Sequence, residues 1–332
     1  MSAFNQQQGL QNLTNKRLTV TEQSSNCNAC SPRTRSRMAM ISGKDNQSPS
    51  LITGAEGVMD RRKFMEHSLA AGLVASTALR LDEEAFAGDT SAGVGRSVTL
   101  PAKPGPISLH LSKTVVMVVD MQNDFGSKGG MFDRAGLDIS IIQRAVPPTV
   151  RVLAAARCAH IQIVYLKMGF RPDLSDMGAP DSPNWASHHA IGVGTAVRAP
   201  NGVESRILVR DTWNTEIVDE LRPQPSDIVV YKHRYSGFFQ TDLDDRLRRL
   251  GTRSIIFTGC TTSVCVESTL RDAMFHDYSA VLLADCTGEV VGCDLACTNH
   301  EASLLLVEKR FGSVSTSEQF VKALQVTPKA SA

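Results

Sequence analysis

The chain lacks three features that would assign it to a specialised class of protein. Its 332 residues contain 35 Lys and Arg against 34 Asp and Glu, so no excess of positive charge favours binding to nucleic acid. No apolar run reaches the roughly 18–20 residues that cross a membrane as a helix. Eight cysteines are too few for a small disulfide-stapled domain. With 42% hydrophobic and 21% charged residues, the composition is that of a globular protein and excludes a wholly disordered or collagen-like chain.

The first 58 residues differ in composition from the rest of the chain. They are rich in Gln, Asn, Ser and Thr and contain few large apolar residues. Such a segment buries too little apolar surface to offset its chain entropy, so we predict a disordered extension over residues 1–58. A Cys27-x-x-Cys30 pair lies within it, but no second pair and no histidine at ligand spacing accompanies it, so no zinc site is predicted there.

A secretory signal is predicted over residues 59–87. Paired arginines in the string Arg61-Arg62-Lys-Phe64 precede a mildly apolar stretch, residues 68–79, and a small-x-small cleavage site, Ala85-Phe-Ala87. The Arg-Arg-x-Phe core resembles the twin-arginine type, whose cargo crosses the membrane already folded. We therefore expect the twin-arginine machinery to export the protein to the periplasm, with cleavage after Ala87.

Two alternatives to this interpretation of the N-terminal region stay open. The same pattern is compatible with an amphipathic surface helix in a cytoplasmic protein. Translation starts at either Met1 or Met59, since a signal seldom follows so long an extension. Residues 88–106 are expected to form a linker to the folded domain.

From residue 107 the pattern is typical of an α/β protein. Continuous apolar runs indicate strands buried on both faces of a parallel sheet. They are Thr114–Asp120, Ile161–Leu166, Ile207–Val209, Ile228–Tyr231, Ser254–Thr258 and Ala280–Ala284. Helices are expected between several of them, and Asn299–Lys309 is expected to be the last helix. The alternation predicts one doubly wound α/β domain over residues 107–325, followed by a tail over residues 326–332.

Reactive side chains follow the predicted strands, where open α/β sheets bind their ligands. Asp120 ends the first strand, Lys232 follows the fourth, and Cys265 lies in the first turn of the helix after the fifth. The positive end of that helix should lower the thiol pKa and favour the thiolate. Asp120 could accept the thiol proton, and Lys232 could keep the carboxylate ionised. A buried structural cysteine and an aspartate that caps a strand remain the alternative.

Three blocks of sequence resemble the isochorismatase-like cysteine hydrolases. They are Val118-Val-Asp120-Met-Gln-Asn-Asp-Phe125, Lys232-His-Arg-Tyr235-Ser-Gly-Phe-Phe239 and Thr258-Gly-Cys-Thr-Thr-Ser-Val-Cys265-Val-Glu-Ser-Thr-Leu-Arg-Asp272. The resemblance implies a six-stranded parallel sheet flanked by helices and a catalytic triad of Asp120, Lys232 and Cys265. It also implies a cis peptide between Cys260 and Thr261, and an oxyanion hole formed by the backbone N–H groups of Thr261 and Cys265.

Within this family the chain resembles the ureidoacrylate amidohydrolases of pyrimidine breakdown. The strings Ser182-Pro-Asn184 and Arg234-Tyr235-Ser-Gly-Phe-Phe239 support this likeness. Where those enzymes line the pocket with Asn and Trp, this chain has Met168 and Phe170, which offer neither an amide nor an indole N–H. The resemblance predicts substrate contacts from five residues: Met168, Phe170, Asp176, Asn184 and Tyr235.

No metal and no cofactor are predicted. Nicotinamidases of the same superfamily bind a divalent metal after the second strand, whereas this chain has the adjacent pair His188-His189, which cannot easily chelate together from one face. Four further residues cluster in sequence without a known zinc pattern: Cys286, Cys293, Cys297 and His300. The expected partners are a small-molecule substrate, the twin-arginine machinery and further copies of this chain, with no nucleic acid.

The predicted function is that of a cysteine amidohydrolase. It would cleave a C–N bond of a small ureido, carbamoyl or amide substrate through a thioester acyl-enzyme. Two alternatives stay open. One is an isochorismatase-type vinyl-ether hydrolase, which needs no thiol, and the other is a non-catalytic binding module on the same fold.

Sequencing the N-terminus of the mature protein tests the export signal. Because the cleavage site ends at Ala87, we expect the mature chain from the periplasm to begin near Gly88. Replacing Arg61 and Arg62 with lysines should retain the precursor in the cytoplasm. Full-length protein found only in the cytosol of cells with the unaltered signal would refute export.

Overall fold

The computed structural model describes residues 95–325. The predictions for residues 1–58, 59–87 and 326–332 lie outside the described residues, as does the Cys27-x-x-Cys30 pair. No helix among residues 95–325 is both long and apolar enough to cross a membrane.

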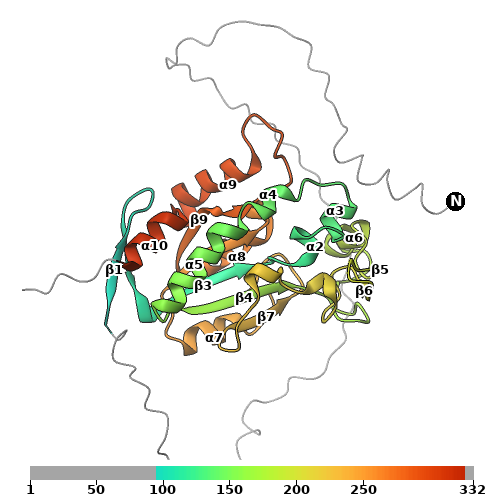
Figure 1. The fold of residues 1–332 in the computed structure, drawn as a ribbon, viewed down its shortest axis with the longest axis horizontal. Helices are drawn as coiled ribbons and strands as arrows, with labels where there is room; N and C mark the ends of the chain where they lie inside the picture. Colours follow the sequence, from blue (N-terminus) through green and yellow to red (C-terminus); the bar gives the residue numbers. More distant parts are fainter. Residues whose placement is uncertain (1–94, 326–332) are drawn as a thin grey trace, which may run out of the picture. The chain divides into compact units, whose positions relative to one another are not determined.

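A six-stranded parallel sheet forms the centre of the described domain (Figure 1). In spatial order its strands are β10 (Ser313–Ser315), β9 (Ser279–Gly288), β8 (Ser254–Cys260), β3 (Thr114–Val119), β4 (Gln162–Met168) and β7 (Ile228–Lys232). All neighbouring strands are parallel. The central strands β3 and β8 are buried along their whole length, which explains their continuous apolar sequence. The predicted fold class is confirmed for this domain.

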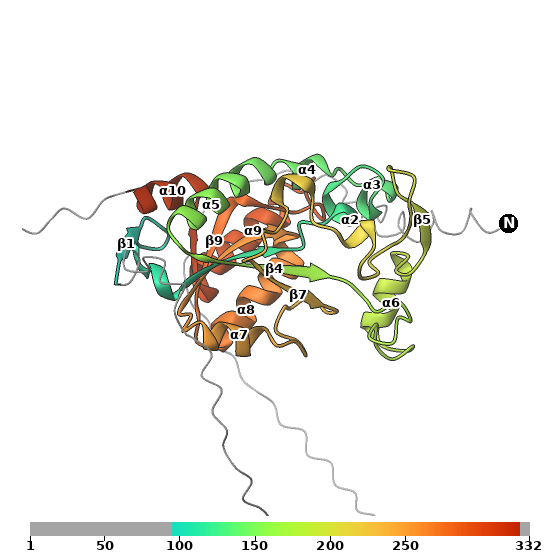
Figure 2. The same ribbon diagram turned by 60° about the horizontal axis from the view of Figure 1, so that its bottom comes forward.

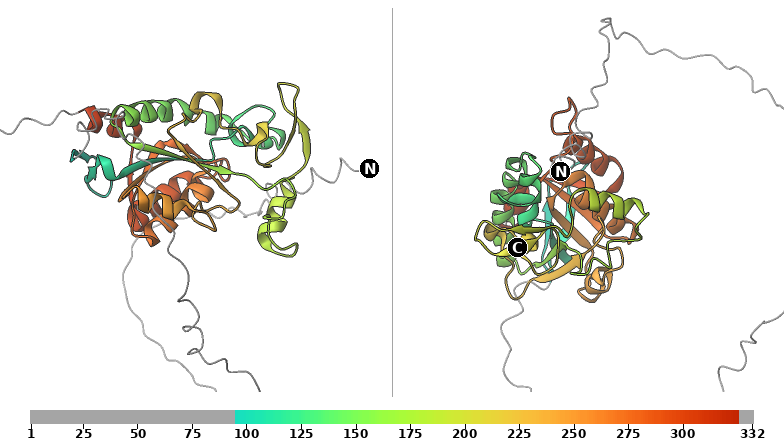
Figure 3. Two further views of the ribbon diagram at one scale, coloured as in Figure 1. Left: turned by 90° about the horizontal axis from the view of Figure 1, so that it is seen from below. Right: turned by 90° about the vertical axis from the view of Figure 1, so that its right-hand side faces the viewer.

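Helices cover both faces of the sheet (Figures 2 and 3). One face packs against α5 (Val146–Cys158) and α10 (Ser317–Gln325). The other packs against α7 (Leu243–Arg249), α8 (Glu267–Phe275) and α9 (Asn299–Leu306). Side chains that alternate along each strand supply the two apolar layers, because successive residues of a strand point to opposite faces.

Shorter elements connect these layers. Several of them gather at the carboxyl end of the sheet, where α2, α3, α6, β5 and β6 lie near one another (Figures 1 and 2). The short helices are η1 (Leu111–Lys113), α2 (Asn123–Gly126), α3 (Met131–Arg134), α4 (Ser140–Gln143), α6 (Pro183–Ala190), η2 (Trp213–Thr215), η3 (Asp219–Leu221) and the π-helical turns η4 (Thr262–Val266) and η5 (Val307–Phe311). A small antiparallel pair, β5 (Ala196–Arg198) and β6 (Glu204–Arg206), follows α6.

One of the six predicted strands is wrong. Ile207–Val209 forms a turn, and only Val209 makes an isolated bridge, to Phe170. All three residues are buried, so their apolar character reflects packing under the surrounding loops and not membership of the sheet. The sixth strand is β10, which is too short to show a pattern in the sequence.

The boundaries of the folded domain also differ from the prediction. Within the expected linker, β1 (Ser97–Leu100) pairs antiparallel with β2 (Ile107–His110). Leu100 and Leu109 of this hairpin are buried in the core. The last described helix is α10, not the helix at Asn299, and the guanidinium of Arg96 donates a 2.6 Å hydrogen bond to the carbonyl of Leu324 within α10. This hydrogen bond joins the start of the β1–β2 hairpin to the last described helix, α10.

Substitution of Gly259 tests how closely the backbones of β8 and β3 approach each other. It has φ +117°, and a Cβ there would lie 2.0 Å from the carbonyl oxygen of Val119. We expect Gly259→Ala to lower the free energy of unfolding, measured by urea denaturation, by at least about 2 kcal/mol. Gly251→Ala is the matched control. Gly251 has φ +65° with no atom within 4 Å of the added Cβ, so only the backbone strain of about 1 kcal/mol applies. Equal losses in the two variants would contradict the steric explanation.

Candidate functional site

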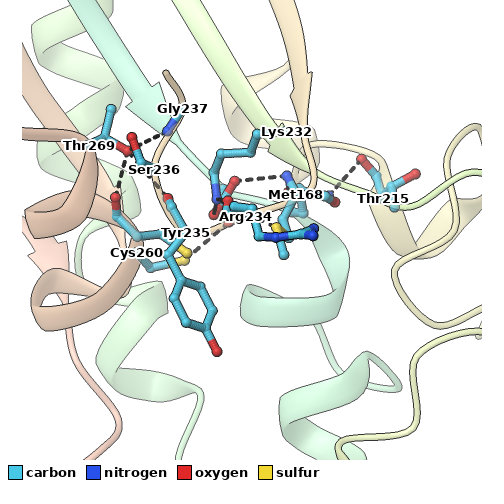
Figure 4. Close-up of polar contacts among 12 residues, drawn as sticks. Met168, Thr215, Lys232, Arg234, Tyr235, Ser236, Gly237, Cys260 and Thr269 are labelled. Carbon is cyan, nitrogen blue, oxygen red and sulfur yellow. Dashed lines mark hydrogen bonds and ion pairs between the residues drawn. The ribbon is translucent and has the colours of Figure 1, made fainter. Parts of the chain in front are cut away.

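A buried ion pair lies at the carboxyl ends of β3 and β7. Figure 4 shows its lysine, Lys232, beside Met168 and Arg234. Lys232 Nζ lies 2.7 Å from Asp120 Oδ2, and the two side chains are 0% and 1% exposed. β4 runs between the two strands, and the backbone N–H of its last residue, Met168, donates a 2.8 Å hydrogen bond to Asp120 Oδ1. The ammonium also lies 3.2 Å from the carbonyl oxygen of Arg234 and 3.6 Å from the sulfur of Met168. Both charges are thus fully enclosed by protein.

The backbone of Asp120 is left-handed, with φ +51°. This conformation is uncommon for a residue other than glycine, and it concentrates at functional sites where surrounding contacts hold it. Here the N–H of Asp120 donates to Leu166 on β4 at 2.9 Å. Two residues later, the side-chain amide of Gln122 accepts a hydrogen bond from the N–H of Met168 and donates one to the carbonyl of Met168. The turn after β3 is therefore fastened to the end of β4.

Cys265 lies in the π-helical turn η4, which leads from β8 into α8. Its thiol lies near both the Asp120 carboxylate and the Lys232 ammonium, since both groups shift its pKa. The hydroxyl of Thr269, one turn later, donates to the carbonyl of Cys265 at 2.7 Å and accepts the N–H of Gly237 at 3.0 Å. This hydroxyl fastens the loop after β7 to the helix that carries the cysteine (Figure 4).

The resting thiol is protonated, in contrast to the thiolate expected from the helix end. Burial raises the pKa of Cys265 well above its ordinary value, and the charge of Lys232 only partly opposes this effect. The cost of placing a thiolate in a buried site outweighs the favourable helix end. Burial likewise raises the pKa of Asp120, although Lys232 opposes the shift. Burial lowers the pKa of Lys232, but the contacts with Asp120 and Cys265 raise it by more.

The segment between β8 and η4 provides the other elements of the site. The peptide bond between Cys260 and Thr261 is cis, as the family resemblance implies. Cys260 is fully buried, and its thiol donates to the carbonyl of Asp120 at 3.1 Å, so it is not placed as a nucleophile. Among the described residues, the N–H of Thr261 donates no hydrogen bond. That N–H and the N–H of Cys265, in the first turn of its helix, suit an oxyanion.

The five predicted substrate contacts differ in what they touch. Met168 and Tyr235 adjoin the triad, because Met168 contacts Lys232 and Tyr235 lies in the loop fastened to Thr269. Phe170 is 0% exposed and its ring lies edge-on to that of His188, and its role in lining the pocket stays a prediction. Asn184 directs its amide to the carbonyl of Met177 at 2.7 Å.

Through its carboxylate, Asp176 contacts two arginines and, among the described residues, no member of the triad. Its carboxylate forms an ion pair with Arg210 at 2.8 Å and accepts the backbone N–H of Arg171 at 2.9 Å. It lines a cavity whose lining includes no member of the triad.

His188 is the aromatic residue next to Tyr235 that the sequence pattern did not point to. Its ring centroid lies 5.1 Å from that of Phe170 and 5.4 Å from that of Tyr235, and it covers Phe170. Its Nδ1 lies 2.7 Å from the carbonyl oxygen of Asn184, so this nitrogen carries the hydrogen. Burial lowers the pKa of His188, and the charges of Arg234 and Lys232 lower it further, so the ring is neutral.

The two adjacent histidines contact different rings. His189 stacks on Trp185 with centroids 4.5 Å apart, whereas His188 contacts Phe170 and Tyr235. Within residues 95–325, no group of three or more His, Cys, Asp or Glu side chains is placed to hold a metal ion.

The chain is similar to known proteins of one family. Residues 114–319 match the isochorismatase domain. The chain is 44% identical over 224 residues, 68% of its length and 86% of the relative's, to ureidoacrylate amidohydrolase RutB of Variovorax paradoxus (strain S110). It is 44% identical over 223 residues, 67% and 95% of the two chains, to the protein of the same name from Agrobacterium fabrum (strain C58 / ATCC 33970). The crystal structure of a cysteine hydrolase from Pseudomonas syringae pv. phaseolicola 1448A superimposes with a TM-score of 0.55 at 28% identity, covering 65% of this chain and 94% of that one.

Proposed function

The chain belongs to the isochorismatase family of hydrolases, and from this premise we propose that it is a cysteine amidohydrolase acting on a small ureido, carbamoyl or amide substrate. The observation that carries the proposal is the place of the Cys265 thiol beside the buried Asp120–Lys232 ion pair, both members of which shift the thiol pKa. A nucleophile in contact with a carboxylate base, which is itself held by a cation, is the arrangement that acyl transfer requires.

Asp120 is the base of the first half-reaction. As the sulfur of Cys265 bonds to the substrate carbonyl carbon, the thiol proton passes to Asp120. The carbonyl oxygen gains the negative charge and accepts hydrogen bonds from the N–H groups of Thr261 and Cys265. The intermediate collapses by breaking the C–N bond, and Asp120 returns the proton to the leaving nitrogen. The acyl group stays on sulfur as a thioester.

Water completes the cycle in the second half-reaction. Asp120 accepts a proton from the attacking water, and the C–S bond of the thioester breaks. The proton then returns to the sulfur of Cys265. The ammonium of Lys232 stays charged throughout and keeps Asp120 ionised between steps, because a carboxylate this deeply buried would otherwise hold its proton.

The substrate class is supported by the relatives and by the wall of the site. The relatives named ureidoacrylate amidohydrolase favour a ureido group. Met168, whose thioether lies against Lys232, makes one wall apolar. A site that hydrogen-bonds a substrate group rejects analogues strongly, whereas an apolar wall discriminates by only ~1–3 kcal/mol per methylene. A substrate less polar than ureidoacrylate is therefore favoured.

Replacement of the nucleophile tests the proposed function. We expect Cys265→Ser to leave the fold intact and abolish ammonia release from a panel of ureido acids and amides, because a carboxylate does not activate a hydroxyl as it does a thiol. Cys260→Ser is the matched control and should keep most of the activity. Retention of more than about one per cent of the activity by Cys265→Ser, well above the loss expected for a missing nucleophile, would refute the assignment.

Met168 tests the polarity of the substrate. Met168→Asn places an amide beside the site, so we expect it to raise kcat/KM for ureidoacrylate relative to less polar ureido substrates. The shorter side chain leaves a small cavity, which should cost about 1–3 kcal/mol of stability, so the ratio between substrates is the quantity to compare. Met168→Leu, apolar and of similar size, should leave the ratio unchanged. The interpretation is wrong if the unaltered enzyme already prefers ureidoacrylate and Met168→Asn lowers that preference.

A further inference from the structure

A cavity of about 440 Å³ lies beyond the carboxyl ends of β4 and β7. Its charged lining consists of three arginines, Arg171, Arg210 and Arg234, and one carboxylate, Asp176. His233 also lines it and is neutral, because burial lowers its pKa. The lining of this cavity thus carries two more positive charges than negative ones.

Neighbouring charges do not cancel this excess. Lys167 and Asp211 both contact the hydroxyl of Tyr231, at 2.9 and 3.2 Å, and offset each other. Asp173 feels the charge of Arg171, but it is exposed and does not line the cavity. No described residue therefore neutralises the excess positive charge of the lining, and a bound anion would neutralise it.

Two of the three guanidinium groups are held rigidly. Arg210 donates to the carbonyl of Gly169 at 3.0 Å and to Asp176 at 2.8 Å, and it lies over the ring of Tyr231. Arg234 donates through Nη1 to the carbonyl of Asp176 at 2.8 Å and lies over the ring of Phe239. Groups fixed in this way lose little conformational freedom when they bind a ligand.

Each arginine retains N–H groups that no described residue uses. Arg210 Nη1 and Arg234 Nη2 donate no hydrogen bond within residues 95–325, and neither does the side chain of Arg171. Gly178 leaves room beside Arg234, since a Cβ on Gly178 would lie 3.2 Å from Nη2. Planar guanidinium groups with free N–H donors match the oxygens of carboxylates and phosphates.

We propose that this arginine cavity binds a small oxyanion, a carboxylate or a phosphate. The cavity adjoins the triad through one short segment, because the carbonyl of Arg234 lies 3.2 Å from Lys232 Nζ while its guanidinium lines the cavity. The bound group is either the substrate's own carboxylate or a free anion. Only the first of these sources depends on the proposed function.

Titration with inorganic phosphate tests the site. By calorimetry on the full chain at low ionic strength, we expect saturable binding to the unaltered protein. Arg171→Gln should weaken it about fivefold or more, as for the loss of one charge-assisted hydrogen bond, and Arg171→Glu should abolish it. Arg171 is exposed and its side chain has no partner among the described residues, so both variants should fold. Arg198→Gln is the matched control, since it removes the same charge from an exposed ion pair with Glu204 on another element.

Absence of saturable phosphate binding to the unaltered protein would overturn the proposal, as would equal weakening by Arg198→Gln. The same titration on Cys265→Ser should give unchanged binding, so a failure of the proposed catalytic role is distinguishable from a failure of this site.

Steady-state kinetics then identifies the source of the anion. Competitive inhibition by phosphate, with a KM raised by Arg171→Gln for a ureido acid but not for its carboxamide, identifies the substrate carboxylate. Inhibition that is not competitive, or binding without inhibition, identifies a free anion.

Discussion

The buried ion pair between Asp120 and Lys232 is the interaction on which the functional end of the domain depends. Burying either charge alone would cost several kcal/mol. The pair is tolerated because each charge neutralises the other, with Lys232 Nζ 2.7 Å from Asp120 Oδ2. The two residues come from β3 and β7, with β4 between them, so the contact requires these three strands to keep their register. Met168 at the end of β4 completes the arrangement, since its N–H bonds the carboxylate.

The same burial determines how the thiol can react. In this buried site Cys265 stays protonated and the carboxylate becomes a stronger base, because burial raises the pKa of both groups. In the mechanism that we propose, nucleophilic attack and proton transfer to Asp120 are therefore coupled, and the negative charge never rests on an isolated thiolate. Cys260 is as deeply buried, but its thiol faces the carbonyl of Asp120 and not the carboxylate, so it lacks a base.

Much of this architecture could be predicted from the sequence, because buried strands and short blocks carry local signals. The apolar run before Asp120 indicated β3, and the order of three blocks indicated which residues meet. Tertiary effects were not predictable in the same way. Ile207–Val209 is apolar because loops cover it, and the pKa of Cys265 depends on burial that no helix position reveals. His188 contacts the rings of Phe170 and Tyr235, which lie on other segments of the chain.

The pH dependence of kcat/KM tests the central claim, that an ionised Asp120 takes the proton of a neutral thiol. Activity requires the carboxylate, so it should fall as the pH drops through the pKa of Asp120. Because burial raises that pKa, the acidic limb should lie above the ordinary value of 3.8. Above this limb, activity should stay level through neutral pH, since no thiol titration is needed. Activity that instead rises with pH along a thiol titration near the ordinary value of 9.0, or an acidic limb at or below 3.8, would contradict the account.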